Sequence, residues 1–571
     1  MVTIVRRHTT HTPDRPVFTI LPDGDDAEPS ITFEMLDSRA RRIADLLLRH
    51  TESGERVLLL CRPGKEFIYS FYGCLYASVI AVPTYLPEPG QRTQGTDRLA
   101  GILEDCTPAV ILSTDEIRSE IKNGIIEFPR WEHSVWLTLE AVEHETPSEW
   151  IPEPVPSATV ALLQYTSGST ADPKGVIVTH GNLIHNIRLI NRSLGLDESP
   201  VIVGWLPPYH DMGLVSMIVA PAILPGHAVL MPTIAFLQHP IRWLRAISEY
   251  GGTASAAPNF AFDLCATRIS QQARRTVNLS SLAVVANGAE PIRPESMRRF
   301  ADAFAASGFR PEAIVPMYGL AESTLMVSGT SSQSPWILRD FDTESLARGI
   351  VREVPEGSAN CRTLVGCGSS HDLDVVIADP EHRTRCAPGT VGEIWVAGAS
   401  VAAGYWGRTE LSNETFGARL ADSGQGPYLR TGDLGFQIDA GLFVVGRMKD
   451  VLIVAGRNHY PQDIELTVEG AHSAVRPGCA VAFAGRPDAP ESVVVAAELR
   501  GTREQTPDLD QTRTAIRCAV MREHHLSIGE ILLLPPGSIP KTPSGKPQRS
   551  ALRGAYLSGV LTPHREERKQ R

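Results

Sequence analysis

The sequence predicts an α/β protein: a large N-terminal domain of helix-covered sheets plus a β-rich subdomain, followed by a small α/β C-terminal domain. Two observations favour this fold class. Between about residues 155 and 330, short apolar runs alternate with helical patterns, which is typical of parallel sheets covered by helices. Beyond residue 364, turns separate the apolar runs, and the last part of the chain holds a second, shorter strand–helix series. We expect the large domain over residues 1–447 and the small one over residues 448–571.

Apolar periodicity predicts the individual elements, with a period of two for strands and about 3.6 for helices. The first block holds two helix–strand pairs, Phe33–Arg49 with Arg56–Leu60 and Glu66–Ser78 with Ile80–Thr84. The expected strands of the central block are Val160–Gln164, Val176–Val178, Val201–Trp205, Ala228–Met231, Leu282–Ala286 and Ala313–Met317. The expected helices between them are Leu183–Leu194, Ile241–Tyr250, Phe260–Ile269 and Glu295–Ala306.

A polar stretch over about residues 331–364 interrupts this series, and we interpret it as an inserted segment rather than part of a main sheet. The β-rich subdomain that follows is expected to hold the strands Asp374–Ala378, Val391–Ala397 and Leu442–Val445. In the small domain the pattern predicts a strand, a helix, two strands and a helix, at Val451–Val454, Pro461–Gly470, Cys479–Phe483, Val493–Leu499 and Asp508–His525.

Composition excludes several classes of protein. Of 571 residues, 42% are hydrophobic and 21% charged, which is an ordinary globular mixture and excludes a disordered or fibrous chain. The net charge of −11 argues against nucleic acid as a partner, because phosphate binding favours a basic surface. The charge is uneven, since residues 448–571 carry +3 and the remainder carries −14.

The sequence also indicates the cellular compartment of the protein. It contains no long uninterrupted apolar run and no apolar segment of a secretory signal at its start, so we expect neither a membrane span nor secretion. Its nine cysteines are scattered and form no CxxC pair. These features predict a cytoplasmic protein with reduced thiols, and the chain is long enough to fold as a monomer.

The strongest local motif is Tyr165-Thr-Ser-Gly-Ser-Thr-Ala-Asp-Pro-Lys174-Gly175, placed between two expected strands. Hydroxyls, a glycine and a lysine in one loop can surround anionic oxygens together with backbone N–H groups. The Walker A spacing is absent. A plain hydroxyl-rich linker is the alternative for such a loop taken alone.

Two further segments suit a nucleotide. Tyr318-Gly319-Leu-Ala-Glu322 offers an aromatic face for a base and a carboxylate for Mg²⁺, which prefers oxygen ligands shared with phosphates. Asp433 follows Arg430-Thr-Gly and can accept hydrogen bonds from both hydroxyls of a ribose. A buried aspartate that caps a helix or turn is the alternative for Asp433.

These motifs, with Gly446-Arg-Met-Lys-Asp450 and Pro540–Lys546, occur in the order seen in the adenylate-forming superfamily of acyl-CoA synthetases, luciferases and peptide-synthetase adenylation domains. The resemblance covers about residues 10 to 555. Residues 205–214 (WLPPYHDMGL), 257–261 (APNFA), 287–291 (NGAEP) and 456–461 (GRNHYP) more specifically resemble fatty acyl-AMP ligases. That family also carries an insertion near 331–364. The resemblance implies that ATP activates a medium- to long-chain fatty acid to acyl-AMP, followed by transfer to the phosphopantetheine thiol of an acyl carrier protein.

The resemblance also implies roles for individual residues. The β- and γ-phosphates of ATP would be held by Thr166, Ser167, Gly168, Ser169, Thr170 and Lys174. Glu322 would hold Mg²⁺ and count among the catalytic residues, while Asp433 and Arg447 would hold the ribose. The adenine would be framed by Gly288, Ala289, Glu290, Tyr318 and Gly319.

Two more residues are candidates for catalysis by resemblance. Lys546 lies in a Pro-Ser-Gly-Lys-Pro loop and would bridge the acyl carboxylate and the α-phosphate, with Lys541 a lesser candidate. His210 would gate the acyl pocket or contact the adenylate, and a structural role is its alternative. The superfamily places a hinge near Lys449, about which the small domain is mobile, and the insertion would bias that motion.

Substrate and carrier contacts are less defined by the sequence. Apolar candidates for the acyl pocket are Trp205, Met231, Phe236, Phe260 and Phe262, with plain core as the alternative for each. Because carrier proteins are usually acidic, five arginines are candidates for docking: Arg513, Arg517, Arg522, Arg549 and Arg553.

Three other functions stay open at this point. A fatty acyl-CoA ligase would share the first half-reaction and use coenzyme A as acceptor, and the insertion-like segment argues against it. An amino-acid adenylation domain would carry Phe-Asp where this chain has His210-Asp211. A non-catalytic scaffold on the same fold is disfavoured by retention of Lys174, Glu322, Asp433 and Lys546.

Overall fold

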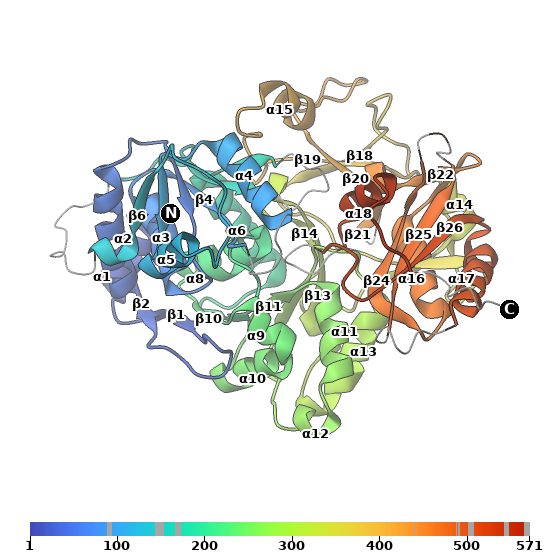
Figure 1. Cartoon of the computed structure of the whole chain (residues 1–571), viewed down its shortest axis with the longest axis horizontal. Coiled ribbons are helices and arrows are strands. Elements are labelled where there is room, and N and C mark those ends of the chain that lie inside the picture. The colour runs from blue at the N-terminus through green and yellow to red at the C-terminus, as the bar shows by residue number, and fades with distance from the viewer. Residues whose placement is uncertain are drawn as a thin grey trace.

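The large N-terminal part is built on two helix-covered sheets, as the computed structural model of the chain shows (Figure 1). The structure describes residues 1–87, 94–142, 153–165, 173–439, 441–486, 488, 491–500, 508–541 and 547–564. The six-stranded sheet has the order β6 (Val135–Thr138), β5 (Val110–Ser113), β3 (Arg56–Leu59), β4 (Ile80–Pro83), β7 (Val160–Tyr165) and β8 (Gly175–Thr179). All its neighbours are parallel except β7 and β8, which form a hairpin around the segment with the hydroxyl-rich motif.

The second sheet has eight strands and is also mainly parallel. Its order is β14 (Met326–Gly329), β13 (Ile314–Gly319), β12 (Val284–Asn287), β11 (Ala254–Ala257), β9 (Val201–Gly204), β10 (His227–Leu230), β1 (Pro16–Ile20) and β2 (Ile31–Thr32). Only the two edge pairs are antiparallel. The carboxyl ends of β12 and β13 lie side by side, and they carry the Asn287-Gly288 and Tyr318-Gly319 segments.

Helices cover both sheets. In the N-terminal part they are α1 (Val2–His11), α2 (Phe33–Leu48), α3 (Lys65–Tyr76), α4 (Gln94–Cys106), α5 (Asp115–Lys122), α6 (His180–Leu194), α7 (Asp211–Gly213), α8 (Ala220–Ile223), α9 (Thr233–Gln238), α10 (Ile241–Tyr250), α11 (Asn259–Arg268), α12 (Gln271–Arg274) and α13 (Pro294–Phe304). A π-helical segment, Leu214–Val219, joins α7 to α8. Local sequence explains their limits: α6 starts at a capping box of Thr179 and Asn182 and stops at Gly195, whose φ of 61° is left-handed.

The β-rich part follows as two antiparallel sheets. Residues 331–364 do not join the main sheets; β15 (Leu338–Asp342), β16 (Glu353–Val354) and β17 (Cys361–Val365) form a small sheet that carries α14 (Thr343–Ala347). The other sheet has the order β18 (Asp374–Ala378), β19 (Gly392–Ala397), β20 (Leu429–Ile438) and β21 (Gly441–Arg447), with α15 (Thr409–Phe416) before β20. An apolar cluster that includes Phe341 and Phe443 packs the small sheet onto β20 and β21.

The C-terminal region lies at the right of Figure 1 and has its own core. It begins with the hairpin β22 (Leu452–Val454) and β23 (Arg457–His459), and continues with a sheet of β24 (Val475–Ala484), β25 (Val493–Leu499) and β26 (Ile528–Leu534). Three helices pack on it: α16 (Pro461–Ala471), α17 (Leu509–His524) and α18 (Arg549–Leu557).

The predicted fold class is confirmed, including the helix-covered sheets, the β-rich part and the small C-terminal α/β region. Two differences have a local cause. Strand β20 was not expected, because Gly432, Asp433 and Gly435 interrupt its apolar pattern. Strand β11 was not expected either, since its sequence is Ala-Ser-Ala-Ala and small residues have little strand preference. Among the described residues, no helix is long and apolar enough to cross a membrane.

Candidate active site

Asp433 lies within β20, and a second strand and a tyrosine hold its carboxylate. Its Oδ2 accepts a hydrogen bond from the Tyr318 hydroxyl at 2.8 Å, and its Oδ1 lies 3.0 Å from Nε of Arg447. Arg447 is the register partner of Asp433 on β21, whereas Tyr318 comes from the end of β13. Burial, reinforced by the charge of Asp433, raises the pKa of Tyr318 well above its usual value, so the hydroxyl stays a donor. The structure thus brings together three residues that the sequence predicted separately.

Glu322 and Lys174 approach the same tyrosine, Tyr405. The Tyr405 hydroxyl donates to Oε1 of Glu322 at 2.9 Å, and Nζ of Lys174 lies 5.4 Å from the centre of the Tyr405 ring. A β-bridge between Val176 and Tyr405 fixes this arrangement, because Val176 follows Lys174 by two residues. A cation and a carboxylate therefore approach one tyrosine, the cation at its ring and the carboxylate at its hydroxyl.

Burial raises the pKa of Glu322, and the nearby charge of Asp211 adds to the rise, while the Tyr405 hydroxyl and Arg447 oppose it. The charges of two carboxylates, chiefly Asp433 and then Glu322, raise the pKa of Arg447. Arg447 thus interacts electrostatically with both Asp433, the ribose candidate, and Glu322, the metal candidate. The two carboxylates therefore belong to one site. A cation bound at Glu322 would favour the charged form of this half-buried carboxylate.

The turn that carries Glu322 is set by sequence and by α6. A Cβ at Gly319 would overlap the carbonyl oxygen of Leu325, so the chain can fold back here only with glycine. Asn186 of α6 then holds the returning strand from both sides: its Nδ2 donates to the Met326 carbonyl at 2.8 Å and its Oδ1 accepts from the Met326 N–H at 3.1 Å. The position of Glu322 therefore depends on a buried amide in a helix far away in the sequence.

His210 and Asp211 form a tight pair at the start of α7. Nδ1 of His210 lies 2.6 Å from Oδ1 of Asp211, and both side chains are mostly buried. The preceding loop is held by Gln164 of β7, which donates to the Tyr209 carbonyl at 2.8 Å. His210 is thus held by Asp211, whose charge also acts on Glu322.

The turn over residues 288–290 follows β12. Ala289 has a left-handed φ of 69° and is exposed. Oε1 of Glu290 accepts the Phe260 N–H at 2.6 Å at the start of α11, so this carboxylate holds the turn against the helix. Gly288 packs close to the carbonyl of Met317, directly before Tyr318. The turn and Tyr318 are thus neighbours, which agrees with the expected frame for a base.

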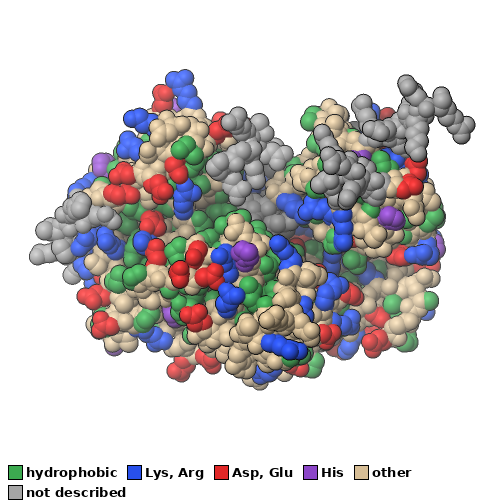
Figure 2. Space-filling view, turned by 60° about the horizontal axis from the view of Figure 1, so that its bottom comes forward, with side chains coloured by type: hydrophobic (Ala, Val, Ile, Leu, Met, Phe, Trp, Pro, Cys, Tyr) green, Lys and Arg blue, Asp and Glu red, His purple; other side chains and the backbone are tan. Residues whose placement is uncertain are grey.

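Six of the predicted residues lie outside the described residues: Thr166, Ser167, Gly168, Ser169, Thr170 and Lys546. Lys541 is described; its Nζ donates to the Gly478 carbonyl at 2.9 Å and approaches the Cys479 thiol at 3.3 Å. Figure 2 shows the surface hollowed between the two lobes, with Lys and Arg side chains along the margin of the C-terminal lobe.

The predicted docking arginines do not form one set. Arg549 is mostly buried and bonds to Asp450, Glu465 and the Ala482 carbonyl, so it is a structural residue. Arg553 donates to the carbonyls of Ala484 and Gly485. Arg517 and Arg522 are exposed on α17.

Most acyl-pocket candidates are core residues. The rings of Trp205 and Phe236 stack at 3.9 Å between centroids and are almost fully buried. Phe262 packs edge-on against Phe300 of α13. Met231 alone of the five candidates lines an apolar cleft between α3 and the eight-stranded sheet.

Sequence reasoning missed Tyr405. It lies 83 residues from Glu322 and in no expected element, so no periodic pattern marks it. The one available signal was a tyrosine next to Gly404, whose φ of 142° lets the chain turn toward β8. Asn186 was placed in a helix, but its buried role was not anticipated.

Comparison with known proteins identifies the family. The AMP-binding enzyme family matches residues 5–406, and the AMP domain of the Disco-interacting protein 2-like family matches residues 449–566. The medium-chain-fatty-acid–acyl-carrier-protein ligase JamA of Moorena producens is 40% identical over 551 residues, which cover 96% of this chain and 93% of JamA. The long-chain-fatty-acid–AMP ligase FadD32 of Mycolicibacterium smegmatis is 36% identical, over 94% of this chain and 91% of that protein.

Solved structures agree with the relatives. The fatty acid AMP ligase of Legionella pneumophila superposes with a TM-score of 0.76 at 36% identity, covering 98% of this chain and 96% of the other. A structure from work on the fatty acyl-adenylate ligases of Escherichia coli and L. pneumophila gives a TM-score of 0.86 at 30% identity, covering 98% and 97%. The motifs, the fold and these matches over nearly the whole length lead to one conclusion: the chain belongs to the AMP-binding enzyme family and, within it, to the fatty acid AMP ligases.

Proposed function

We propose that the protein uses ATP to activate a medium- to long-chain fatty acid as acyl-AMP, and then transfers the acyl group to the phosphopantetheine thiol of an acyl carrier protein. The observation that carries the proposal is the convergence of Lys174 and Glu322 on Tyr405, next to the Asp433–Arg447 pair. This arrangement offers a cation for phosphate oxygens, a carboxylate for a metal ion, and an acceptor for ribose hydroxyls. The relatives JamA and FadD32 carry matching activities in their names.

The first step joins two negatively charged reactants, so the site must supply positive charge and alignment. A fatty-acid carboxylate oxygen attacks the α-phosphorus, the bond to the bridging oxygen breaks, and pyrophosphate leaves with its electron pair. Lys174 and residues 166–170 hold the β- and γ-phosphates, and Lys546 bridges the carboxylate and the α-phosphate. Asp433 and Arg447 hold the ribose, while Tyr318, Gly319 and the turn over 288–290 frame the adenine.

A single half-buried carboxylate fits Mg²⁺, which commonly uses one or two protein carboxylates and completes its shell with phosphate oxygens and water. No cluster of three metal-ligating side chains occurs in the part of the chain that is described, which suits a metal shared with the substrate. Glu322 would hold the ion, and bound Mg²⁺ would neutralise charge on the phosphate oxygens.

The second step transfers the acyl group from AMP to the carrier protein. The carrier thiolate attacks the acyl carbonyl, the thioester forms, and AMP leaves with the former carboxylate oxygen. We place the boundary between a large domain (1–447) and a mobile small domain (448–571) at the short helical turn Met448–Asp450, with the hinge near Lys449. The proposed insertion over 331–364 contacts both: Arg362 donates to the Val445 carbonyl at 3.1 Å and lies 3.1 Å from Asp463 of α16. This double contact supports a restricted motion and a carrier protein rather than coenzyme A as acceptor.

The proposal also covers the setting of the reaction. All nine cysteines are free, as expected of a reducing cytoplasm, and we propose a monomer there. Exposed Arg517 and Arg522 remain the docking candidates for an acidic carrier protein of a lipid, polyketide or lipopeptide assembly line.

A paired assay tests the proposal. The enzyme is incubated with ATP, Mg²⁺ and dodecanoate, and the product is offered to coenzyme A or to a phosphopantetheinylated carrier protein. We expect pyrophosphate release, bound acyl-AMP and transfer to the carrier only. Efficient acyl-CoA formation would instead assign the acyl-CoA ligase activity, and absence of pyrophosphate with any fatty acid would refute adenylation.

A further inference from the structure

One carboxylate of α4 is connected to both ends of the hydroxyl-rich segment, residues 166–172. Asp105 is the next-to-last residue of the helix, and its Oδ2 accepts the Tyr165 hydroxyl at 2.6 Å. Tyr165 ends β7, directly before the segment. Oδ1 of Asp105 lies 3.2 Å from Nη2 of Arg408, and the same nitrogen donates at 3.2 Å to the carbonyl of Pro173, directly after the segment. Asp105 thus holds the start of the segment directly and its end through one arginine.

Close packing accompanies these hydrogen bonds. A Cβ at Gly101 of α4 would lie 3.0 Å from Cγ and Cδ of Pro173, so the helix lies directly on the proline ring. A Cβ at Gly175 would lie 3.0 Å from the hydroxyl oxygen of Tyr165, its register partner in the β7–β8 hairpin. Glycine at these two positions therefore lets the helix and the tyrosine ring approach the two ends of the segment.

The three side chains form a mostly buried polar network, which we call the Asp105 network: Asp105, Tyr165 and Arg408. Tyr165 is 5% exposed, and burial, reinforced by Cys106 and by the hydrogen bond to Asp105, raises its pKa, so its hydroxyl stays a donor. The Asp105 side chain is 12% exposed, and Arg408 supplies the counter-charge that such a carboxylate requires. Because hydrogen bonds to a charged group are the stronger ones, loss of this charge weakens both connections.

Arg408 also belongs to the segment that carries Tyr405. The Tyr405 ring lies 5.4 Å from Nζ of Lys174, and the N–H of Trp406 donates to the Gly175 carbonyl at 2.8 Å. The segment therefore runs along the start of β8, and Arg408 connects it to α4. The position of the Lys174 ammonium group thus depends on the same network as the two ends of the hydroxyl-rich segment.

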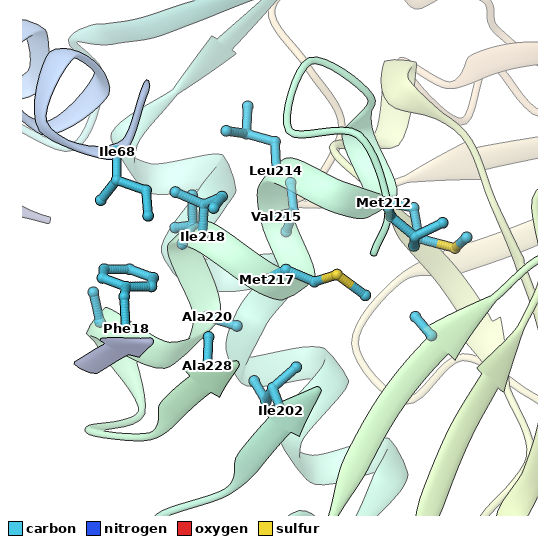
Figure 3. Close-up of a cluster of buried hydrophobic side chains, with 14 of the residues drawn as sticks. Phe18, Ile68, Ile202, Met212, Leu214, Val215, Met217, Ile218, Ala220 and Ala228 are labelled. Carbon is cyan, nitrogen blue, oxygen red and sulfur yellow. The ribbon is translucent and has the colours of Figure 1, made fainter. Parts of the chain in front are cut away.

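The neighbouring segment that follows His210 is held in another way. Figure 3 shows Ile218 of this segment pointing toward Phe18 and Ile68, within a cluster of buried apolar side chains. The buried apolar residues of α4 belong to a separate cluster. The residues assigned to adenine and ribose lie on β13, β20, β21 and the turn after β12, and none of these elements carries a member of the Asp105 network. A change at Asp105 should therefore act on the phosphate segment and leave the nucleoside site in place.

We propose that Asp105 is a positioning residue for the β- and γ-phosphates, acting through Tyr165 and Arg408 on the two ends of the segment over 166–172. The inference rests on the proposed role of residues 166–170 in phosphate binding. The three side chains act on the backbone ends of the segment, not on the substrate itself. ATP and pyrophosphate carry the groups that this segment holds, whereas AMP does not. Affinity for ATP and pyrophosphate therefore depends on Asp105, and affinity for AMP does not.

Two variants test the proposal. Asp105→Asn removes the charge and keeps the size of the side chain, whereas Tyr165→Phe removes only the hydroxyl at the start of the segment. Calorimetric titration with magnesium pyrophosphate and, separately, with AMP measures the two affinities. For Asp105→Asn we expect roughly tenfold weaker binding of pyrophosphate and unchanged binding of AMP. The KM for ATP should rise by a similar factor while the KM for dodecanoate stays the same. Tyr165→Phe should show a smaller loss of the same kind, and it decides alone if Asp105→Asn does not fold.

Asp37→Asn is the matched control, because a similar network surrounds Asp37 of α2. Its Oδ1 accepts the Tyr76 hydroxyl at 2.9 Å, and its Oδ2 lies 2.9 Å from Nε of Arg41. The Asp37 side chain is 6% exposed, and the network includes no residue assigned to the substrate. This variant loses the same kind of buried contacts as Asp105→Asn. We expect it to keep the wild-type affinities for both pyrophosphate and AMP.

Wild-type affinity for pyrophosphate in the folded Asp105 and Tyr165 variants would overturn the proposal. Equal losses for pyrophosphate and AMP would overturn it as well, because they indicate a general structural role. Failure of the proposed function has a separate signature: the wild-type protein would then bind neither ligand and release no pyrophosphate from ATP.

Discussion

Arg549 provides a sharp test of how the C-terminal region is held together. Its guanidinium binds three groups: Oδ2 of Asp450 at 2.9 Å, Oε1 of Glu465 at 2.7 Å and the carbonyl of Ala482 at 2.9 Å. These partners lie at the proposed hinge, on α16 and on β24. Replacing Arg549 by Met keeps the apolar stem but leaves two carboxylates without their shared cation. The variant should therefore loosen α16 and the hinge together.

The expected loss of stability follows from the burial of the Arg549 side chain. Breaking a buried ion pair costs about 3–5 kcal/mol, and because the Arg549 side chain is 21% exposed we expect the lower part, about 2–4 kcal/mol. At about 1.4 kcal/mol per factor of ten, local opening becomes roughly 30- to 1000-fold more frequent. Hydrogen–deuterium exchange of α16 peptides measures this directly, with peptides of α6 as an internal reference in the same sample.

Arg522→Met is the matched control, since Arg522 is 73% exposed and, among the described residues, its ion pair is with its neighbour Glu523. A surface pair of this kind contributes less than about 1 kcal/mol, so exchange of α16 should stay at the wild-type rate. Unchanged exchange in Arg549→Met, together with slower transfer to the carrier protein, would refute this reasoning and return Arg549 to a docking role.

Three more perturbations address the site and the contact of the insertion. Glu322→Gln should lower pyrophosphate release roughly 100-fold and raise the Mg²⁺ concentration needed, as measured by titration with Mg²⁺; a normal Mg²⁺ requirement would exclude the residue as a metal ligand. Asp433→Asn weakens the hydrogen bond from Tyr318 and removes the ion pair with Arg447. It should raise the KM for ATP roughly tenfold with little change in the KM for the fatty acid. Equal changes in both KM values would contradict a role in ribose binding. Burial raises the pKa of Asp463 to about 6. The protonated side chain therefore adds to the free energy of unfolding at low pH, and this contribution is lost as the pH rises through 6. Asp463→Asn should stabilise the protein at pH 8, by at most about 3 kcal/mol, and leave it unchanged near pH 3, which denaturant unfolding at the two pH values measures.

The sequence predicted the parts of the fold where local pattern and tertiary structure agree. Strand β18 and helix α10 have the expected bounds, because their apolar periodicity is undisturbed. Strand β26 and helix α18 were not predicted; both flank the loop with Lys546, where Pro and Gly obscure the pattern. Strand β20 was not predicted because polar residues that belong to the site interrupt its apolar pattern.

The site was predicted as a set of motifs but not as contacts. Resemblance placed Tyr318, Glu322, Asp433 and Arg447 near one nucleotide, and the structure joins them by hydrogen bonds and charge. Tyr405 could not be inferred, because nothing in its neighbouring residues indicates that its hydroxyl reaches Glu322. For the same reason Arg549 was misread as a surface cation: its partners come from three separate segments.

The end of β21 at Arg447 has a consequence for recombination between relatives. Every described residue assigned to the nucleotide precedes Met448, whereas Lys546 follows it. A chimera that joins residues 1–447 to the C-terminal region of another family member should therefore keep its affinity for ATP, while its acceptor preference depends on whether the insertion keeps its contact from Arg362 to the donor's counterpart of Asp463. The contacts across the junction that such exchanges must preserve include Tyr460, which packs with Phe341 and Phe443, and Gln462, which donates to the Val445 carbonyl at 2.6 Å. The C-terminal region can thus diversify without loss of nucleotide recognition, as long as these contacts stay intact.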